Sequence, residues 1–321
     1  MTSIISSMTP AQVGALTTKQ IASLAPSDIA ALSTAQAAQL SSAQVGAMST
    51  ADIVQISPAA LAAFQSEQLS GLSTKDIAAL TTAQVTTLST GGTTGQVSAL
   101  TTAQVQALST TEVGSLINTA LTTAQIGELT STQVAGLSPT TLQGVGTTQL
   151  QAISTKDIAA LTTAQVAALT TGATGQVAAL TTAQVQAITT KDIASLAVSS
   201  LTTSQLAVVS SSQVAALAYA QVASLGTSFS TGQISALTTG QITSLTITGL
   251  STAQVQAIST KAIAALTTAQ LTALATGGTT GQVSALTSAQ LGALTYSQVS
   301  QLINDFTTAQ MPSLTNLTPP G

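Results

Sequence analysis

Three Lys-Asp pairs are the first residues in this sequence that could act together as an acid and a base. Each pair lies in a Thr-Lys-Asp-Ile-Ala segment: Lys75-Asp76, Lys156-Asp157 and Lys191-Asp192. Adjacent residues do not face each other on a helix, so the two groups of a pair could not share a proton there. A carboxylate in the first turn of a helix is stabilising. We therefore predict that these Asp residues cap helices and that the pairs are not catalytic.

Three glycine-flanked segments could in principle cradle a phosphate or a nucleic-acid backbone. They are Gly92-Thr93-Thr94-Gly95, Gly172-Ala173-Thr174-Gly175 and Gly278-Thr279-Thr280-Gly281. A phosphate loop requires Gly-Lys-Ser/Thr at its end, whereas Gln follows the last Gly here. The nucleic-acid clamp requires basic flanking residues, and these segments have none. We therefore predict ordinary turns.

Pairs of hydroxyl residues such as Thr81-Thr82 and Thr181-Thr182 recur along the chain. If successive repeats stack in register, these threonines would form rows on a flat face, which could bind ice or a glycan. The alternative, which we favour, is that the first Thr of each pair caps a helix. The nine acidic residues are scattered, without the spacing of a calcium loop.

The composition excludes several classes of function. The chain has no His, Cys, Trp or Arg, and charged residues make up 4%. The usual ligands of zinc, copper and haem are therefore missing, and no Ser-His-Asp or Cys-His nucleophile can form. Five Lys residues are too few for a nucleic-acid surface. We predict a protein that is not an enzyme, with no catalytic residues, no cofactor and no metal site.

Membrane insertion is also not indicated. No segment approaches the roughly 20 apolar residues of a spanning helix. The residues Met1-Thr2-Ser3-Ile4-Ile5 have neither a basic region nor an apolar region of the kind found in a secretory signal peptide. If the protein is exported, we expect a route without a cleaved signal peptide.

The chain is built from an eight-residue repeat. A large apolar residue recurs every eighth position: Met8, Leu16, Leu24, Leu32, Leu40, Met48, Ile56, Phe64, Leu72, Leu80 and Leu88. With the positions named a to h, the consensus is Leu(a)-Ser/Thr(b)-Thr(c)-Ala(d)-Gln(e)-Val/Ile(f)-x(g)-Ala(h), as in Leu161 to Val166. A continuous helix would rotate the apolar stripe by about 80° per repeat, so no face could stay buried. In a continuous strand, a and f would point to opposite faces.

A helix that restarts in every repeat fits the pattern. Ser or Thr at b is then the N-cap, Gln or Asp at e completes a capping box, and a and f form a hydrophobic staple. Position c becomes the first helical residue, where Pro is favoured. Four prolines occupy c: Pro10, Pro26, Pro58 and Pro139. We predict an all-α solenoid of very short capped helices in which a, d, f and h pack inward, with two or three octads per coil. A β-solenoid is the alternative.

Longer and shorter steps interrupt the octads in alternation. The longer steps run from Leu88 to Leu100, Leu169 to Leu180, Leu225 to Leu237 and Leu274 to Leu286. The shorter ones run from Leu116 to Leu121, Leu196 to Leu201, Leu245 to Leu250 and Leu302 to Phe306. We expect loops at the glycines of the longer steps, which are Gly91, Gly92, Gly95, Gly172, Gly175, Gly232, Gly277, Gly278 and Gly281. The expected organisation is one continuous solenoid, 1–321, with regular octads over 8–88, four insertion modules over 88–306 and a tail over 307–321.

The octad Leu-Thr-Thr-Ala-Gln-Val-x-Ala resembles a repeat of large bacterial exported proteins that are described as adhesion or haem-utilisation proteins. The resemblance covers Met8 to Leu314 and implies a role at the cell surface or outside the cell. The composition is also similar to that of surface-layer and adhesin proteins. A haem role finds no support in the residues, since His and Cys are absent.

These observations lead to two hypotheses of function. The first is a self-assembling structural protein, such as a filament, sheath or surface-layer subunit. The small net charge of −4 and the uncharged segments Met1 to Met8 and Leu314 to Gly321 favour association between copies. The alternative is an adhesin stalk, or a module that binds ice or a glycan through its Thr rows. We expect no nucleic-acid partner.

Overall fold

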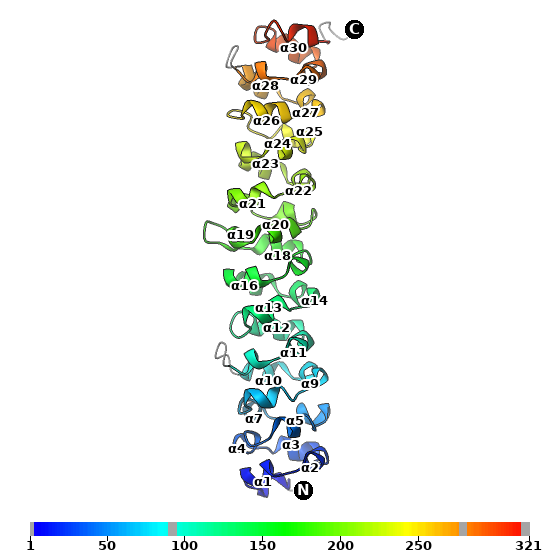
Figure 1. Cartoon of the computed structure of the whole chain (residues 1–321), viewed down its shortest axis with the longest axis vertical. Helices are drawn as coiled ribbons and strands as arrows, with labels where there is room; N and C mark the ends of the chain where they lie inside the picture. Colours follow the sequence, from blue (N-terminus) through cyan, green and yellow to red (C-terminus); the bar gives the residue numbers. More distant parts are fainter. Residues whose placement is uncertain (1–2, 89–94, 276–280, 316–321) are drawn as a thin grey trace. The chain divides into compact units, whose positions relative to one another are not determined.

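The computed structural model describes residues 3–88, 95–275 and 281–315 (Figure 1). These residues form the short α-helices α1 to α30 and several 3-10 helices, and none of them lies in a strand. The prediction of an all-α fold of tandem short helices is confirmed, and the β-solenoid alternative is wrong. The chain divides into two compact units, Met1–Ala168 (unit 1) and Leu169–Gly321 (unit 2).

Unit 1 contains the first eighteen α-helices. They and the 3-10 helices η1 and η3 are η1 Ile5–Ser7, α1 Pro10–Gly14, α2 Thr18–Ala22, α3 Pro26–Ala30, α4 Thr34–Ala37, α5 Ser42–Val45, α6 Thr50–Ile53, α7 Pro58–Ala62, α8 Ser66–Leu69, α9 Thr74–Ala79, α10 Thr82–Thr87, η3 Val97–Ala99, α11 Thr102–Ala107, α12 Thr110–Leu116, α13 Thr123–Gly127, α14 Ser131–Ala135, α15 Pro139–Gln143, α16 Thr147–Ala152, α17 Thr155–Ile158 and α18 Thr163–Ala168.

Unit 2 contains the remaining helices. They are α19 Gln176–Ala179, α20 Thr182–Ala187, η4 Ile193–Ser195, η5 Val198–Ser200, α21 Thr203–Ala207, α22 Ser211–Ala216, α23 Tyr219–Leu225, η6 Gly226–Ser228, α24 Thr231–Ser235, α25 Thr239–Ile242, α26 Thr252–Ala257, α27 Thr260–Ala264, α28 Thr268–Ala275, η8 Val283–Ala285, α29 Ser288–Ala293, α30 Tyr296–Leu302 and η9 Met311–Ser313.

Most helices begin at a Ser or Thr that caps them. At the start of α10, the Gln84 N–H donates to Thr81 Oγ1 at 3.2 Å, and the Thr81 N–H donates to Gln84 Oε1 at 2.8 Å. The predicted capping box is therefore present, and Ser or Thr at b has the same role in most other repeats. The four prolines at c begin α1, α3, α7 and α15, as predicted.

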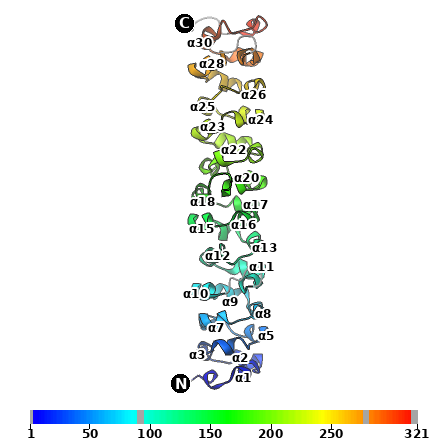
Figure 2. The same cartoon turned by 90° about the vertical axis from the view of Figure 1, so that its left-hand side faces the viewer.

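Three octads make one coil in unit 1. In the regular octads, a helix packs against the third helix after it: α1 against α4, α2 against α5, and α3 against α6. In Figure 1, α1, α4, α7 and α10 follow one another along one side of unit 1, and Figure 2 shows α1, α7 and α10 in the same order from a second side. The sequence allows two or three octads per coil, and the packing of the helices shows that there are three. The chain turns at position a, so each coil has three corners.

The core is built from positions a, e and f. In the octad that begins at Leu40, the side chains of Leu40, Gln44 and Val45 are buried, whereas Ala43 at d is exposed and Ala47 at h is half-buried. The expectation that d packs inward is therefore wrong. Each residue turns a helix by about 100°, so d lies about 150° from the midpoint of e and f and faces solvent.

The insertion after Leu169 lengthens a corner without removing its cap. The Gln176 N–H donates to Thr170 Oγ1 at 2.9 Å, and the Thr170 N–H donates to Gln176 Oε1 at 3.1 Å. Between them the chain turns with Gly172 at a φ of 95°, and the Gly175 N–H donates to the Gly172 carbonyl oxygen at 3.0 Å. The predicted turn is therefore present at Gly172-Ala173-Thr174-Gly175.

Other expected loops differ from the structure or lie outside it. Gly232 is predicted to lie in a loop but lies inside α24, because the chain turns at the buried residue Phe229 and Ser230 caps the next helix. Residues 307–315, assigned to the tail, contain a further corner, since Gln310 Nε2 donates to the carbonyl oxygens of Val283 and Leu286. The following expected loop residues lie outside the described part of the chain: Gly91, Gly92, Thr93, Thr94, Gly277, Gly278, Thr279 and Thr280.

Glycine allows two stacked helices of unit 1 to approach closely. A Cβ atom at Gly71 would lie 2.3 Å from the Ser42 carbonyl oxygen, and one at Gly46 would lie 2.9 Å from the Gly71 carbonyl oxygen. Both contacts are with backbone atoms, which cannot move aside as a flexible side chain can. The packing of α5 against α8 therefore depends on these glycines.

We expect Gly71→Ala to lower the free energy of unfolding by about 1 to 3 kcal/mol, because the new methyl group must displace the Ser42 backbone. Chemical denaturation of the full chain, followed by circular dichroism, measures this. Gly114→Ala in α12 is the matched control, because its nearest Cβ contact is an ordinary 3.8 Å. Equal stability of Gly71→Ala and the unmodified protein would contradict the close packing.

Candidate interaction surface

The glutamine at position e is buried at the corner and joins two coils. Gln84 shows the geometry: its Oε1 accepts the Thr81 N–H, and its Nε2 donates to the carbonyl oxygens of Ile53 and Ile56 at 3.0 and 2.9 Å. Ile53 and Ile56 occupy positions f and a of the corner in the preceding coil. One side chain thus caps its own helix and holds the corner beneath it. We call this arrangement the corner clamp.

The corner clamp recurs in both units. In unit 1, donation from Nε2 to two or three corner carbonyls is found at Gln36, Gln44, Gln68, Gln96, Gln104, Gln125, Gln133 and Gln165. In unit 2, it is found at Gln205, Gln213, Gln221, Gln233, Gln241, Gln254, Gln270, Gln282, Gln290, Gln298 and Gln310. No buried side-chain nitrogen or oxygen of the described residues lacks a hydrogen-bond partner.

Some corners carry a carboxylate in place of the amide. Asp76 accepts hydrogen bonds from the Ser73 N–H at 2.9 Å and the Ser73 hydroxyl at 2.6 Å, and the Thr50 hydroxyl of the preceding coil donates to it at 2.7 Å. A carboxylate has no hydrogen to donate, so the preceding coil supplies one instead. The bond between coils is kept, but its direction is reversed.

The Asp side chains of the three Lys-Asp segments are bonded to cap residues. Asp76, Asp157 and Asp192 are buried and accept hydrogen bonds from the cap hydroxyls of Ser73, Ser154 and Thr189, which confirms the capping interpretation. The neighbouring side chains of Lys75, Lys156 and Lys191 are all exposed. The Lys and the Asp of each pair therefore lie in different environments.

The threonines at positions b and c have different hydrogen-bonding roles. Thr81 at b accepts the Gln84 N–H and is occupied as a cap, whereas Thr82 and Thr102 at c are exposed first residues of helices. A c residue can also contact the following coil, since the Thr50 hydroxyl donates to Asp76 at 2.7 Å.

The first coil of unit 1 carries two incomplete corner clamps. Gln12 Oε1 and Gln20 Oε1 accept the N–H groups of Thr9 and Thr17 at 2.7 and 2.8 Å, as in every capping box. Their Nε2 groups, however, donate to no atom in the described part of the chain, and both side chains are exposed. Leu16 is only half-buried there. These residues form a surface that we call the open first coil.

The third corner of this coil is closed by Asp28. Its carboxylate accepts the Ile4 N–H at 3.1 Å and the Ala25 N–H at 3.3 Å. The hydrogen bond from the Ser3 side chain, followed by those from the two backbone groups, holds the pKa of Asp28 below its ordinary value. The favourable contacts are therefore present above the carboxyl's ordinary pKa and are lost as the pH falls through the lowered one.

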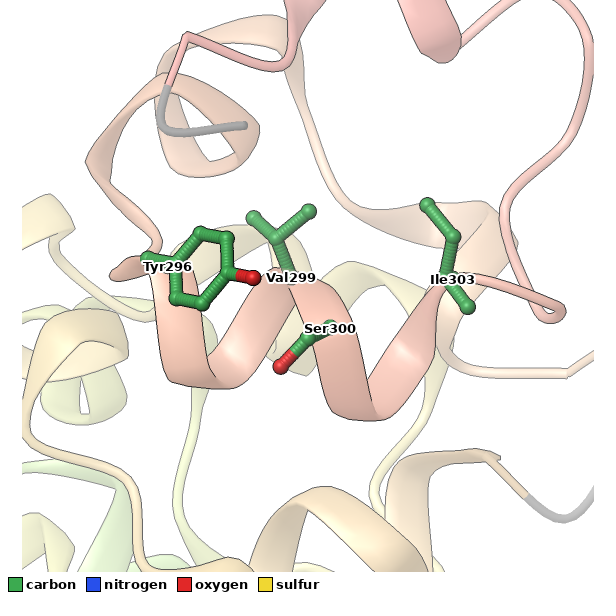
Figure 3. Close-up of a pocket in the computed structure, with 4 residues that line it drawn as sticks. All are labelled: Tyr296, Val299, Ser300 and Ile303. Carbon is green, nitrogen blue, oxygen red and sulfur yellow. The ribbon is translucent and has the colours of Figure 1, made fainter. Parts of the chain in front are cut away.

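Large apolar side chains are exposed at few places in the described residues. They are Ile4 at 61%, Tyr219 at 60%, Met311 at 42% and Ile303 at 41%. Ile303 lines a surface pocket with Tyr296, Val299 and Ser300, and Figure 3 shows these four side chains on or just beyond the same helix, α30. Large apolar side chains are thus exposed in the first coil of unit 1, at Tyr219 in α23, and in the last described coil of unit 2.

The described residues do not bring together three or more His, Cys, Asp or Glu side chains that could hold a metal ion. None of the described helices has both the length and the apolar character needed to cross a membrane.

The family model of the ALTTAQ repeat matches residues 21–58 and 139–171. No curated protein matches the chain. The six letters correspond to Ala160 to Gln165, which run from position h through the corner and the cap to the clamping glutamine. In this chain, the ALTTAQ repeat is therefore the sequence of a corner.

The burial of the ALTTAQ glutamine is the feature that the sequence analysis misses. The capping box explains Gln at e but does not distinguish Gln from Glu, because both side chains have the accepting oxygen. The signal was the recurrence of an amide where a carboxylate would cap equally well. An amide adds a donor, and a donor kept at nearly every repeat requires an acceptor nearby.

We expect Gln84→Glu to lower the free energy of unfolding by about 2 to 3 kcal/mol. The carboxylate can still accept the Thr81 N–H but would face two carbonyl oxygens without a hydrogen to donate. Denaturation in comparison with Gln39→Glu, which adds the same charge at an exposed side chain, measures the effect. Equal stability of the two variants would show that the bond between coils contributes nothing.

The reverse exchange should stabilise the protein. In Asp76→Gln, the new Nε2 can donate to the Val45 and Met48 carbonyl oxygens, which occupy the f and a positions of the corner beneath. We expect the free energy of unfolding to rise by about 1 kcal/mol. Thermal unfolding at neutral pH measures it, and a decrease would contradict the equivalence of the corners.

Proposed function

We propose that this chain is a structural, self-associating subunit of an assembly at the cell surface or outside the cell. The observation that carries the proposal is the corner clamp. Each coil offers amide donors to the coil before it and carbonyl acceptors to the coil after it. A surface that pairs with copies of itself in this way is suited to extension by further copies.

The chemistry of the surface supports the same proposal. The exposed positions are mostly Ser, Thr, Ala and Gln, and the five lysines lie at the exposed position d of separate octads. With a net charge of −4 over 321 residues, copies repel each other weakly. The resemblance of the octad to exported bacterial adhesin-like proteins supports a location outside the cytoplasm.

The direct test is electron microscopy of the full chain in native buffer, together with light scattering over a range of protein concentrations. We expect fibres, sheets or other extended assemblies whose amount grows with concentration. Single molecules at every concentration, confirmed by a constant scattering mass, would contradict the proposal.

A binding role for the exposed c threonines is the second candidate, and the exposure of residues such as Thr82 and Thr102 favours it. Ice binding would appear as thermal hysteresis, and glycan binding as retention on a glycan array. Exchange of the exposed threonines of one helix column for valine would separate this role from assembly, because the capping hydroxyls at b are left intact.

A further inference from the structure

The open first coil presents the donors of a clamp whose acceptors are missing. At inner corners the Nε2 of a position-e Gln donates to f and a carbonyls, as Gln84 does to Ile53 and Ile56. Gln12 and Gln20 have the same capping geometry, with Oε1 on the N–H of the cap residue. Their Nε2 groups are oriented by the same cap but have no acceptor in the described part of the chain.

The apolar surroundings of these amides are incomplete in the same way. Leu40, at position a of an inner coil, is only 3% exposed, whereas Leu16 at the same position of the first coil is half-buried. Ile4, which precedes the first corner, is 61% exposed. The open first coil thus combines two unused donors with apolar side chains that a further layer would cover.

The last described coil of unit 2 has the complementary features. Ile303 and Phe306 stand at the f and a positions of the corner that Gln310 caps, because the Thr307 N–H donates to Gln310 Oε1 at 2.9 Å. No hydrogen bond to the carbonyl oxygens of Ile303 and Phe306 is found among the described residues. The Ile303 side chain is exposed on this coil (Figure 3), and the Met311 side chain is exposed as well.

We infer that the open first coil of one copy docks on the last described coil of a second copy. Gln12 and Gln20 donate to corner carbonyls of the kind found at Ile303 and Phe306, and the exposed apolar side chains are buried between the copies. The contact joins two different surfaces, so it leaves one of each free and can continue indefinitely. This inference rests on the proposed function and names the contact by which the assembly grows.

Two variants block the two surfaces separately. Gln12→Glu with Gln20→Glu keeps both capping oxygens but replaces the donors with negative charges that would face carbonyl oxygens. Ile303→Lys with Met311→Lys places charges on the opposite surface. The matched control is Gln39→Glu with Gln55→Glu, which adds the same charge at exposed positions of inner coils. Circular dichroism and thermal unfolding of dilute protein check that all variants are folded.

Sedimentation and electron microscopy then give the outcome. We expect each blocked variant to need about a tenfold higher concentration, or more, to assemble than the control. An equimolar mixture of the two blocked variants should form pairs and nothing longer, because one free surface of each kind remains. If the unmodified chain and the control assemble but the blocked variants assemble equally well, this contact is wrong. If the unmodified chain does not assemble at all, the proposed function fails as well.

Discussion

The structure depends on one hydrogen-bonding group, the buried side-chain amide found at most corners. A helix of four to eight residues cannot hold its shape in water, because the cost of nucleation exceeds what so few hydrogen bonds return. The corner clamp supplies what the helix lacks. Its oxygen satisfies a backbone N–H at the start of the helix, and its nitrogen satisfies carbonyls where an earlier helix ends. Each amide therefore stabilises two helix ends that would otherwise be unsatisfied.

This arrangement explains why the chain needs so few large side chains. An inner octad buries one residue at a and one at f, and the buried amide, where present, fills the corner between them. The side chain that would be expensive to bury in a hydrophobic core is inexpensive here, because every one of its polar atoms has a partner. Where Asp replaces Gln, as at Asp76, the Thr50 hydroxyl provides the missing hydrogen. The coil before the corner thus supplies carbonyl acceptors to a Gln and a hydroxyl donor to an Asp such as Asp76.

Much of the local structure follows from the sequence, while the arrangement between coils does not. The cap at Thr81, the box at Gln84 and the prolines at the first helical position are determined by neighbouring residues, so a single octad contains the information. The number of octads per coil is set by the turning angle at the corners. No residue type in the sequence indicates that angle. The apolar pattern of the sequence does not predict the extra corner at Phe229, because Leu225 and Leu237 fit that pattern equally well. The acceptors of the glutamine amides lie 24 to 35 residues earlier in the chain, beyond any local pattern.

Hydrogen exchange of the glutamine side-chain amides, measured by NMR on dilute and selectively labelled protein, tests the corner clamp most directly. The account predicts that the Nε2 protons of buried residues such as Gln84 and Gln241 are strongly protected, while those of Gln12 and Gln20 exchange as fast as in a free amide. Uniformly fast exchange at all of these residues would show that the amides do not hold one coil to the next, and would contradict the account.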